Sequence, residues 1–408
     1  MTEFTATAPY VSTALFQFII PFTYKAENSQ QMRISLEKHQ FTSFQIQNHN
    51  QEADYYGKYQ VSYDDLEASF LPLTNKIFFP STQQAKGYQR YSKRLQEQCS
   101  VKIRNRDTAI QIHSVDVILC PYEIGFVTIR PELCPLPLTD AIHFADKIMT
   151  SSAFIKGLAP DVLDLDNILN DGISTEFYPK VYHLSLISVV NERKTQYDFS
   201  DNGLFCITGQ EADSLAGSFY GQLYYSLVAN LFHRLFLLKF LQDYSCINLN
   251  QDKKAIKHLI YMLNSFSSNY FFVTIPMDSD GEEYFNHFKR VLRIDSLYQS
   301  AKEVLTTLFH YEQNSATKKD SLLLLVLTLY TVICGVFSMN LFTHDLEGNI
   351  HWEHLKSYNP FEYFAVFIVF SGMIVVGFLL ISSLIQGWQD KRIQKMWVEK
   401  SVLSSKKK

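Results

Sequence analysis

Two long uncharged stretches near the C-terminus constrain this chain more than any other feature. The first runs from Ser321 to Thr343 and the second from Tyr363 to Trp388. A helix needs about 20 apolar residues to cross the hydrocarbon core of a bilayer, and each stretch exceeds that length. The pattern predicts a transmembrane hairpin over 321–388, with two buried core helices as the alternative interpretation.

The charges around these stretches predict their orientation. Lys318 and Lys319 precede the first stretch, and a basic tail over 389–408 follows the second. Basic residues favour the cytoplasmic side of a membrane. We therefore expect both termini in the cytoplasm, an acidic outer loop over 344–360, and a plasma or inner membrane location.

Composition excludes several classes of function. The net charge is −4, and the sequence has no basic block outside the membrane flanks, which argues against nucleic acid as a partner. The six cysteines are scattered without a CxxC pair, as expected in a reducing cytosol, and predict no metal finger. No catalytic constellation stands out, so we predict that the protein is not an enzyme.

The first 210 residues predict a cytosolic domain of the α+β or α/β class. Alternating apolar residues predict strands at 14–22, 109–119, 124–129 and 182–190. Residues 138–149 have helical spacing, with Thr139 and Asp140 near the start. One sheet with helices is the expected architecture.

The next region, 211–320, predicts helices. Segments 220–244 and 253–268 are apolar at helical period. A third segment opens with acids near Asp278 and contains no proline before Pro360, which predicts one long stalk helix running into the first span. A seam with coiled-coil spacing supplies a reason for several copies to assemble; its residues are Val291, Ile294, Tyr298, Ala301, Leu305 and Leu308.

A stripe of small and polar residues follows one face of the first span. It includes Leu324, Thr328, Thr331 and Gly335 at 100° per residue. One hairpin encloses no path for an ion, so a pore requires several copies around an axis. Close helix packing explains the same stripe equally well.

The end of the first span reads Gly335-Val336-Phe337-Ser338-Met339-Asn340. In this position it resembles the CorA-type metal ion transporter family, whose hallmark is Gly-Met-Asn at the outer end of the first of two C-terminal spans. The segment IQIHSVDVILCPYEIGFVTIR is also weakly similar to a strand pair of that family. The resemblance implies a pentameric funnel with a cytosolic domain, a stalk helix and two transmembrane helices.

The resemblance also implies roles for individual residues. The motif residues Ser338, Met339 and Asn340 would form the pore mouth, with a ring of carboxamides that accept hydrogen bonds from a hydrated Mg²⁺. Thr331, Thr328 and Leu324 would line the path below. Ser338 replaces the glycine of the family, and Asn340 reaches the axis only if the helix ends near residue 338. This substitution makes the preference for magnesium over cobalt, nickel or zinc an open question.

Two groups of acids are candidate cation sites. Acids of the stalk, which the resemblance implies as sensors of cytosolic divalent ions, are equally well explained by helix capping; they are Asp278, Asp280, Asp295 and Glu303. Acids of the outer loop lie near three histidines and either attract a transition metal or form a solvated surface; they are Asp345, Glu347 and Glu353.

Together these features predict a channel-like divalent cation transporter, driven by membrane potential and gated by cytosolic divalent ions. Mg²⁺ or a related ion would be its substrate and regulator, without another cofactor. Its partners would be copies of itself and the lipid bilayer. The alternative is a membrane-anchored oligomeric sensor or scaffold that conducts nothing.

Overall fold

The computed structural model describes most of the first 344 residues and single positions beyond them. The described residues are 10–25, 29–43, 53–56, 59–62, 68–79, 87–103, 106–133, 135–149, 175–190, 194–248, 252–271, 279–344, 360, 363, 367, 370, 371, 374 and 381. The chain divides into two compact units, Met1–Val304 and Leu305–Lys408.

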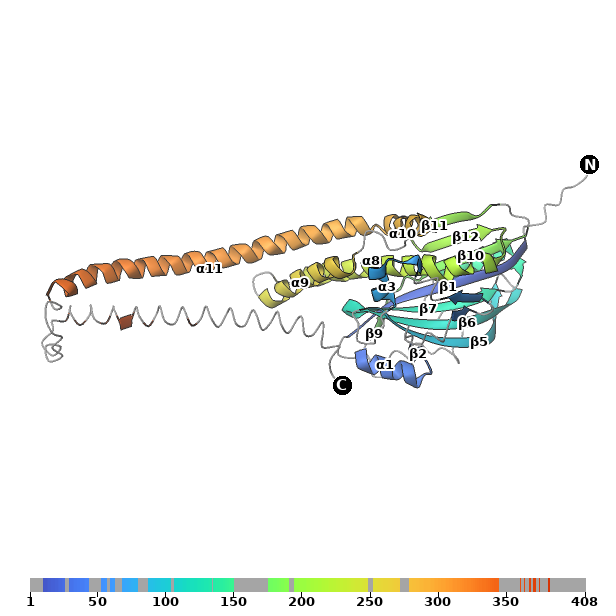
Figure 1. Ribbon diagram of the computed structural model, residues 1–408, viewed down its shortest axis with the longest axis horizontal. Helices are drawn as coiled ribbons and strands as arrows, with labels where there is room; N and C mark the ends of the chain where they lie inside the picture. Colours follow the sequence, from blue (N-terminus) through green and yellow to red (C-terminus); the bar gives the residue numbers. More distant parts are fainter. Residues whose placement is uncertain are drawn as a thin grey trace, which may run out of the picture. The chain divides into compact units, whose positions relative to one another are not determined.

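The first unit is built on a mixed sheet (Figure 1). Among the described residues the sheet has ten strands, in the order β11-β12-β10-β1-β7-β6-β5-β2, with β8 and β9 also paired to β1. The pairs are antiparallel except for β10 with β12, which is parallel. The strands are β1 (Tyr10–Tyr24), β2 (Thr42–Ser43), β5 (Gln89–Ile103), β6 (Arg106–Cys120), β7 (Ile124–Leu133), β8 (Leu136–Pro137), β9 (Thr175–Phe177), β10 (Tyr182–Val189), β11 (Gln196–Ser200) and β12 (Gly203–Thr208); β3 (Ala53–Tyr56) and β4 (Tyr59–Ser62) form a separate hairpin.

Helices lie between strands in the first part of the chain, and all described elements after β12 are helical. A 3-10 turn, η2 (Pro121–Glu123), joins β6 to β7, and a π-helical segment, η3 (Phe219–Leu223), joins α7 to α8. The helices are α1 (Ser29–Lys38), α3 (Pro72–Phe78), α4 (Leu138–Met149), α7 (Ala212–Ser218), α8 (Tyr224–Ser245), α9 (Lys253–Asn269), α10 (Ser279–Val291) and α11 (Ile294–His344).

The central strand β1 divides its side chains between two buried faces. Phe16, Phe18 and Phe22 belong to a core that also contains Phe144 of α4 and Met32 of α1. The intervening residues point to the opposite face, since side chains alternate along a strand. Both faces of β1 are covered, which explains why its segment Ala14–Phe22 is mostly apolar.

The four strands expected from sequence are confirmed. The predicted segments 14–22, 109–119, 124–129 and 182–190 correspond to β1, β6, β7 and β10. The predicted helix over 138–149 is α4, and the segments 220–244 and 253–268 correspond to α8 and α9.

The predicted unbroken stalk helix is wrong at one point. α10 ends at Val291 and α11 begins at Ile294, with Arg293 between them at a φ of 54°. A residue in this left-handed conformation commonly ends a helix, although glycine or asparagine usually occupies the position. Arg234 of α8 donates a hydrogen bond to the Leu292 carbonyl (2.9 Å) and holds the connection in place.

Part of the predicted coiled-coil seam packs against other residues of the same chain. Ile294 and Ala301 are fully buried, and the Tyr298 ring stacks on Phe271 with centroids 4.1 Å apart. The Tyr298 hydroxyl also donates to Ser267 Oγ of α9. This part of the seam therefore packs against neighbouring helical structure of the same chain.

The predicted architecture of two C-terminal transmembrane helices in a pentameric funnel is wrong. Among the described residues, no helix combines the length and apolar character that membrane crossing requires. The uncharged stretch from Ser321 is not a separate span, because it forms the last part of the 51-residue helix α11, whose earlier part carries charges such as Glu303. Most of the second stretch lies outside the described residues.

Candidate functional site

The second unit exposes a large apolar surface on α11. Leu322, Leu325, Leu329 and Val332 are each 58–67% exposed. Every described side chain from Ser321 to Leu329 is exposed, and none of these residues carries a charge. An exposed apolar surface of this kind on a folded chain marks a contact with another molecule or with lipid.

One side of this apolar segment is less exposed than the other. Tyr330 shares a hydrogen bond of 2.7 Å with Ser371 of the second uncharged stretch. Leu323, Val326 and Leu327, which share the Tyr330 side of the helix at 100° per residue, are 38–41% exposed. The first uncharged stretch therefore contacts the second at Tyr330 and Ser371.

The predicted pore-lining residues share one face of α11. The hydroxyl groups of its two threonines bond to carbonyls of the same helix. Thr328 Oγ1 donates to the Leu324 carbonyl at 2.7 Å, and Thr331 Oγ1 donates to the Leu327 carbonyl at 2.8 Å. These bonds to the preceding turn satisfy the hydroxyl hydrogens within the helix. The surface they leave is mostly apolar, and a role in lining a pore stays a prediction.

The predicted pore mouth lies in the helix rather than after it. The backbone of Ser338, Met339 and Asn340 is helical, and α11 continues to His344. The helix therefore does not end near residue 338, which was the condition for Asn340 to reach a pore axis, and Ser338 adopts no left-handed exit. The side chains of these three residues lie outside the described part, so the predicted carboxamide ring stays a prediction.

The predicted sensing acids are spread along two helices. Asp280 is in the first turn of α10, Asp295 in the first turn of α11, and Glu303 further along α11. Asp295 forms an ion pair with Lys289 (2.8 Å) across the α10–α11 connection. Within the described residues of one chain, no three His, Cys, Asp or Glu side chains gather where they could hold a metal. Asp278 and the outer-loop acids Asp345, Glu347 and Glu353 lie outside the described residues.

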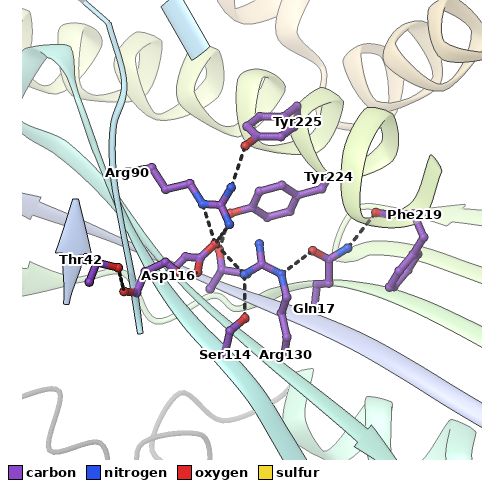
Figure 2. Close-up of polar contacts among 11 residues, drawn as sticks. Gln17, Thr42, Arg90, Ser114, Asp116, Arg130, Phe219, Tyr224 and Tyr225 are labelled. Atoms are coloured by element: carbon purple, nitrogen blue, oxygen red, sulfur yellow. Dashed lines mark hydrogen bonds and ion pairs between the residues drawn. The ribbon is translucent and has the colours of Figure 1, made fainter. Parts of the chain in front are cut away.

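The first unit contains a charged cluster that the sequence did not predict. Asp116 of β6 is fully buried between Arg90 of β5 and Arg130 of β7 (Figure 2). Arg90 Nη2 lies 2.8 Å and Arg130 Nη1 2.6 Å from Asp116 Oδ2, and Ser92 Oγ donates to Asp116 Oδ1 at 2.7 Å. Buried charges of this kind require partners, because leaving water costs each ion several kcal/mol.

The cluster joins the sheet to the helix that covers it. Arg90 Nη1 donates to the Tyr225 hydroxyl (3.3 Å), and the Arg130 guanidinium lies 4.8 Å from the centre of the Tyr224 ring. The Tyr224 hydroxyl in turn shares a hydrogen bond with Thr128 (2.8 Å). Burial raises the pKa of Tyr224 well above its ordinary value, so this hydroxyl keeps its proton. We call this set, with Gln17 and Ser114, the Arg–Asp network.

The Arg–Asp network is suited to holding elements together rather than to catalysis. Arg130 and Asp116 have no exposed side-chain surface, and Arg90 is almost as deeply buried. A substrate would have no access to these groups in this conformation. The one signal in the sequence is Asp116, which lies inside the alternating segment 109–119. A charged residue at such a position is rarely buried unless it is paired.

Two histidines are also buried in the first unit. Burial lowers the pKa of His183 to about 3 and that of His233 to about 4. His183 Nδ1 lies 2.8 Å from Ser185 Oγ, and His233 Nε2 lies 2.8 Å from the Tyr270 carbonyl oxygen. Both imidazoles are therefore neutral near pH 7, and the geometry makes the Nε2 of His233 the protonated nitrogen that donates to the carbonyl.

Comparison with known proteins gives no relative for this chain. No family model matches it, and neither the curated proteins nor the solved structures contain a match.

Proposed function

We propose that this protein is a scaffold that attaches to a lipid membrane through the apolar segment of α11 and gathers there in several copies. The observation that carries the proposal is the exposure of uncharged side chains around α11 from Leu322 to Val332. Ser371 contacts one side of this segment at Tyr330. A helix that is apolar all round needs an apolar environment on its other sides as well.

The polar groups of this segment are compatible with an apolar environment. Thr328 and Thr331 donate to carbonyls of their own helix, and Tyr330 is bonded to Ser371. An unsatisfied hydroxyl would make transfer from water unfavourable. Here the hydroxyl bonds are made before any contact with lipid, which lowers that cost.

The test is flotation of the full-length protein with lipid vesicles in a density gradient, without detergent. We expect the protein to float with the vesicles. Leu325→Asp should reduce vesicle binding by about 100-fold, because a charged side chain costs about 3 kcal/mol in the apolar part of a membrane. Leu73→Asp, at a residue of α3 with similar exposure (58%), serves as the control and should float normally.

The flotation result can contradict the proposal in two ways. Wild-type protein that stays at the bottom of the gradient as a monomer would show that the apolar segment of α11 contacts neither lipid nor other copies of the chain. Wild-type protein that forms oligomers but does not bind vesicles would show that other copies, not lipid, cover α11. Chemical cross-linking of the floated fraction tests the second part of the proposal, and a single-chain band alone would remove it.

Divalent cation transport, which the Ser338–Asn340 motif suggested, stays a prediction. It is tested separately by measuring uptake of Mg²⁺, Co²⁺, Ni²⁺ and Zn²⁺ into vesicles under an inside-negative potential. Uptake that Asn340→Ala abolishes would establish transport. Vesicle binding without any uptake would leave the scaffold as the function.

A further inference from the structure

The helix that covers the Arg–Asp network changes its hydrogen-bond register in the middle. α7, η3 and α8 follow one another without a break, and η3 (Phe219–Leu223) is a π-helix. A π-helical turn contains one residue more than the regular pattern allows, is rare, and often occurs where a protein has a special requirement. Something must therefore favour this turn over the ordinary α-helical one.

The network contacts the helix on both sides of the π turn. Gln17 Nε2 donates to the Phe219 carbonyl at 2.8 Å, and five residues later Tyr224 lies against Arg130 and Thr128. Residues five apart point about 140° away from each other in an α-helix. A turn with i→i+5 bonding rotates less per residue, so five residues complete little more than one turn. The π turn therefore lets the Phe219 carbonyl and the Tyr224 side chain both face the sheet.

Gln17 is held in the orientation that this contact requires. Its side-chain oxygen accepts a hydrogen bond from Arg130 Nε (3.1 Å), and Arg130 is paired with Asp116 (Figure 2). The amide nitrogen must then point to the helix, where it meets the Phe219 carbonyl. A buried, charge-assisted chain therefore runs from Asp116 through Arg130 and Gln17 to the first residue of the π turn.

We propose that this chain of contacts is a register lock, which keeps η3 in the π form and thereby sets the position of α7 relative to α8. When the Gln17 contact is lost, the turn relaxes to α-helical bonding and α7 shifts by one residue. Because α7 contacts β4 and β10, the shift reaches the β3–β4 hairpin. The lock is a conformational device of the first unit and does not depend on the proposed membrane attachment.

The test is hydrogen–deuterium exchange of Gln17→Leu in the full-length protein. We expect the amides from 212 to 224 to exchange about tenfold faster than in the wild type, because the helix loses the buried hydrogen bond between Gln17 and the Phe219 carbonyl. Tyr24→Phe is a matched control on the same strand, because Tyr24 donates a buried hydrogen bond to the Cys120 carbonyl (3.0 Å) away from the helix. It should leave exchange at 212–224 unchanged.

A second variant keeps the proposal testable if Gln17→Leu folds poorly. Deletion of Gln222 removes the extra residue of the π turn and should impair folding in the wild type, where the lock requires that residue. In a Gln17→Met background the same deletion should cost at least tenfold less in the unfolding equilibrium. Equal cost in both backgrounds, or exchange that rises uniformly over the sheet and helices in Gln17→Leu, would overturn the lock.

Discussion

The two units of this protein break the ordinary rule of burial in opposite directions. The first buries two arginines and an aspartate under a helix, and the second exposes leucines on a helix to solvent. An informative feature of a structure is a buried polar group or an exposed apolar patch. The buried charges of the first unit make contacts that stabilise the fold. The exposed apolar surface of the second unit instead indicates contact with another molecule or with lipid.

The largest expected effect comes from removing the buried charge of the Arg–Asp network. Asp116→Asn removes the charge that Arg90 and Arg130 share, and should reduce the free energy of unfolding by about 3–5 kcal/mol, because two buried guanidiniums lose their partner. Urea unfolding monitored by circular dichroism measures this change.

The control for Asp116→Asn is an ion pair of the same length at the surface. Lys180 Nζ lies 2.8 Å from Asp201 Oδ2, and Asp201 is 68% exposed. Asp201→Asn should cost less than about 1 kcal/mol, since exposed ion pairs contribute little. Equal effects of the two substitutions would show that the Arg–Asp network has no special role.

The buried histidines give the next effect. The pKa values of His183 (about 3) and His233 (about 4) lie below the ordinary 6.5, so the unfolded chain binds more protons below pH 6.5. Stability is therefore lost as the pH falls from about 6.5 toward 4, by up to about 1.4 kcal/mol per pH unit for each histidine.

Substitution separates the histidines from the carboxylates that also titrate in acid. His233→Gln keeps a donor for the Tyr270 carbonyl but cannot take up a proton, so unfolding free energy should fall less steeply between pH 6.5 and 4.5. An unchanged slope would show that His233 does not limit acid stability. His287, which is half-buried and stacks on Phe199, is the control position.

The smallest effect concerns the connection between α10 and α11. Arg293 adopts a φ of 54°, and glycine tolerates this conformation without the cost of about 1 kcal/mol that a side chain incurs. Arg293→Gly should raise the thermal midpoint slightly. Lys302→Gly, inside α11, should lower it, because glycine in a helix costs about 1 kcal/mol relative to alanine. A decrease in both variants would argue against strain at Arg293.

The sequence predicted elements well where one local pattern decides the structure. β1, β6, β7 and β10 follow from alternating or continuous apolar runs, and α4 follows from helical spacing after Thr139 and Asp140. β5 was missed because its sequence, QRYSKRLQEQCSVKI, is polar and lacks a strict alternation. The break at Arg293 was missed because no glycine or proline marks it.

The site was harder to predict for a physical reason. The Arg–Asp network joins residues separated by 113 positions for Gln17 and Arg130 and by 135 for Arg90 and Tyr225, so its partners meet only after the sheet forms. The π turn has no sequence signature. The length of the two uncharged stretches predicted two membrane spans. The structure shows instead that α11 extends well beyond the first stretch on its N-terminal side.

The most direct test of membrane attachment through α11 is a measurement of the environment of residue 325. A nitroxide label at Leu325→Cys, in a chain whose native cysteines are replaced, reports access of oxygen and of a water-soluble nickel complex in the presence of vesicles. We predict high oxygen access and low nickel access at residue 325, with the reverse at Leu73→Cys. Nickel access at residue 325 equal to that at residue 73 would contradict membrane attachment through α11.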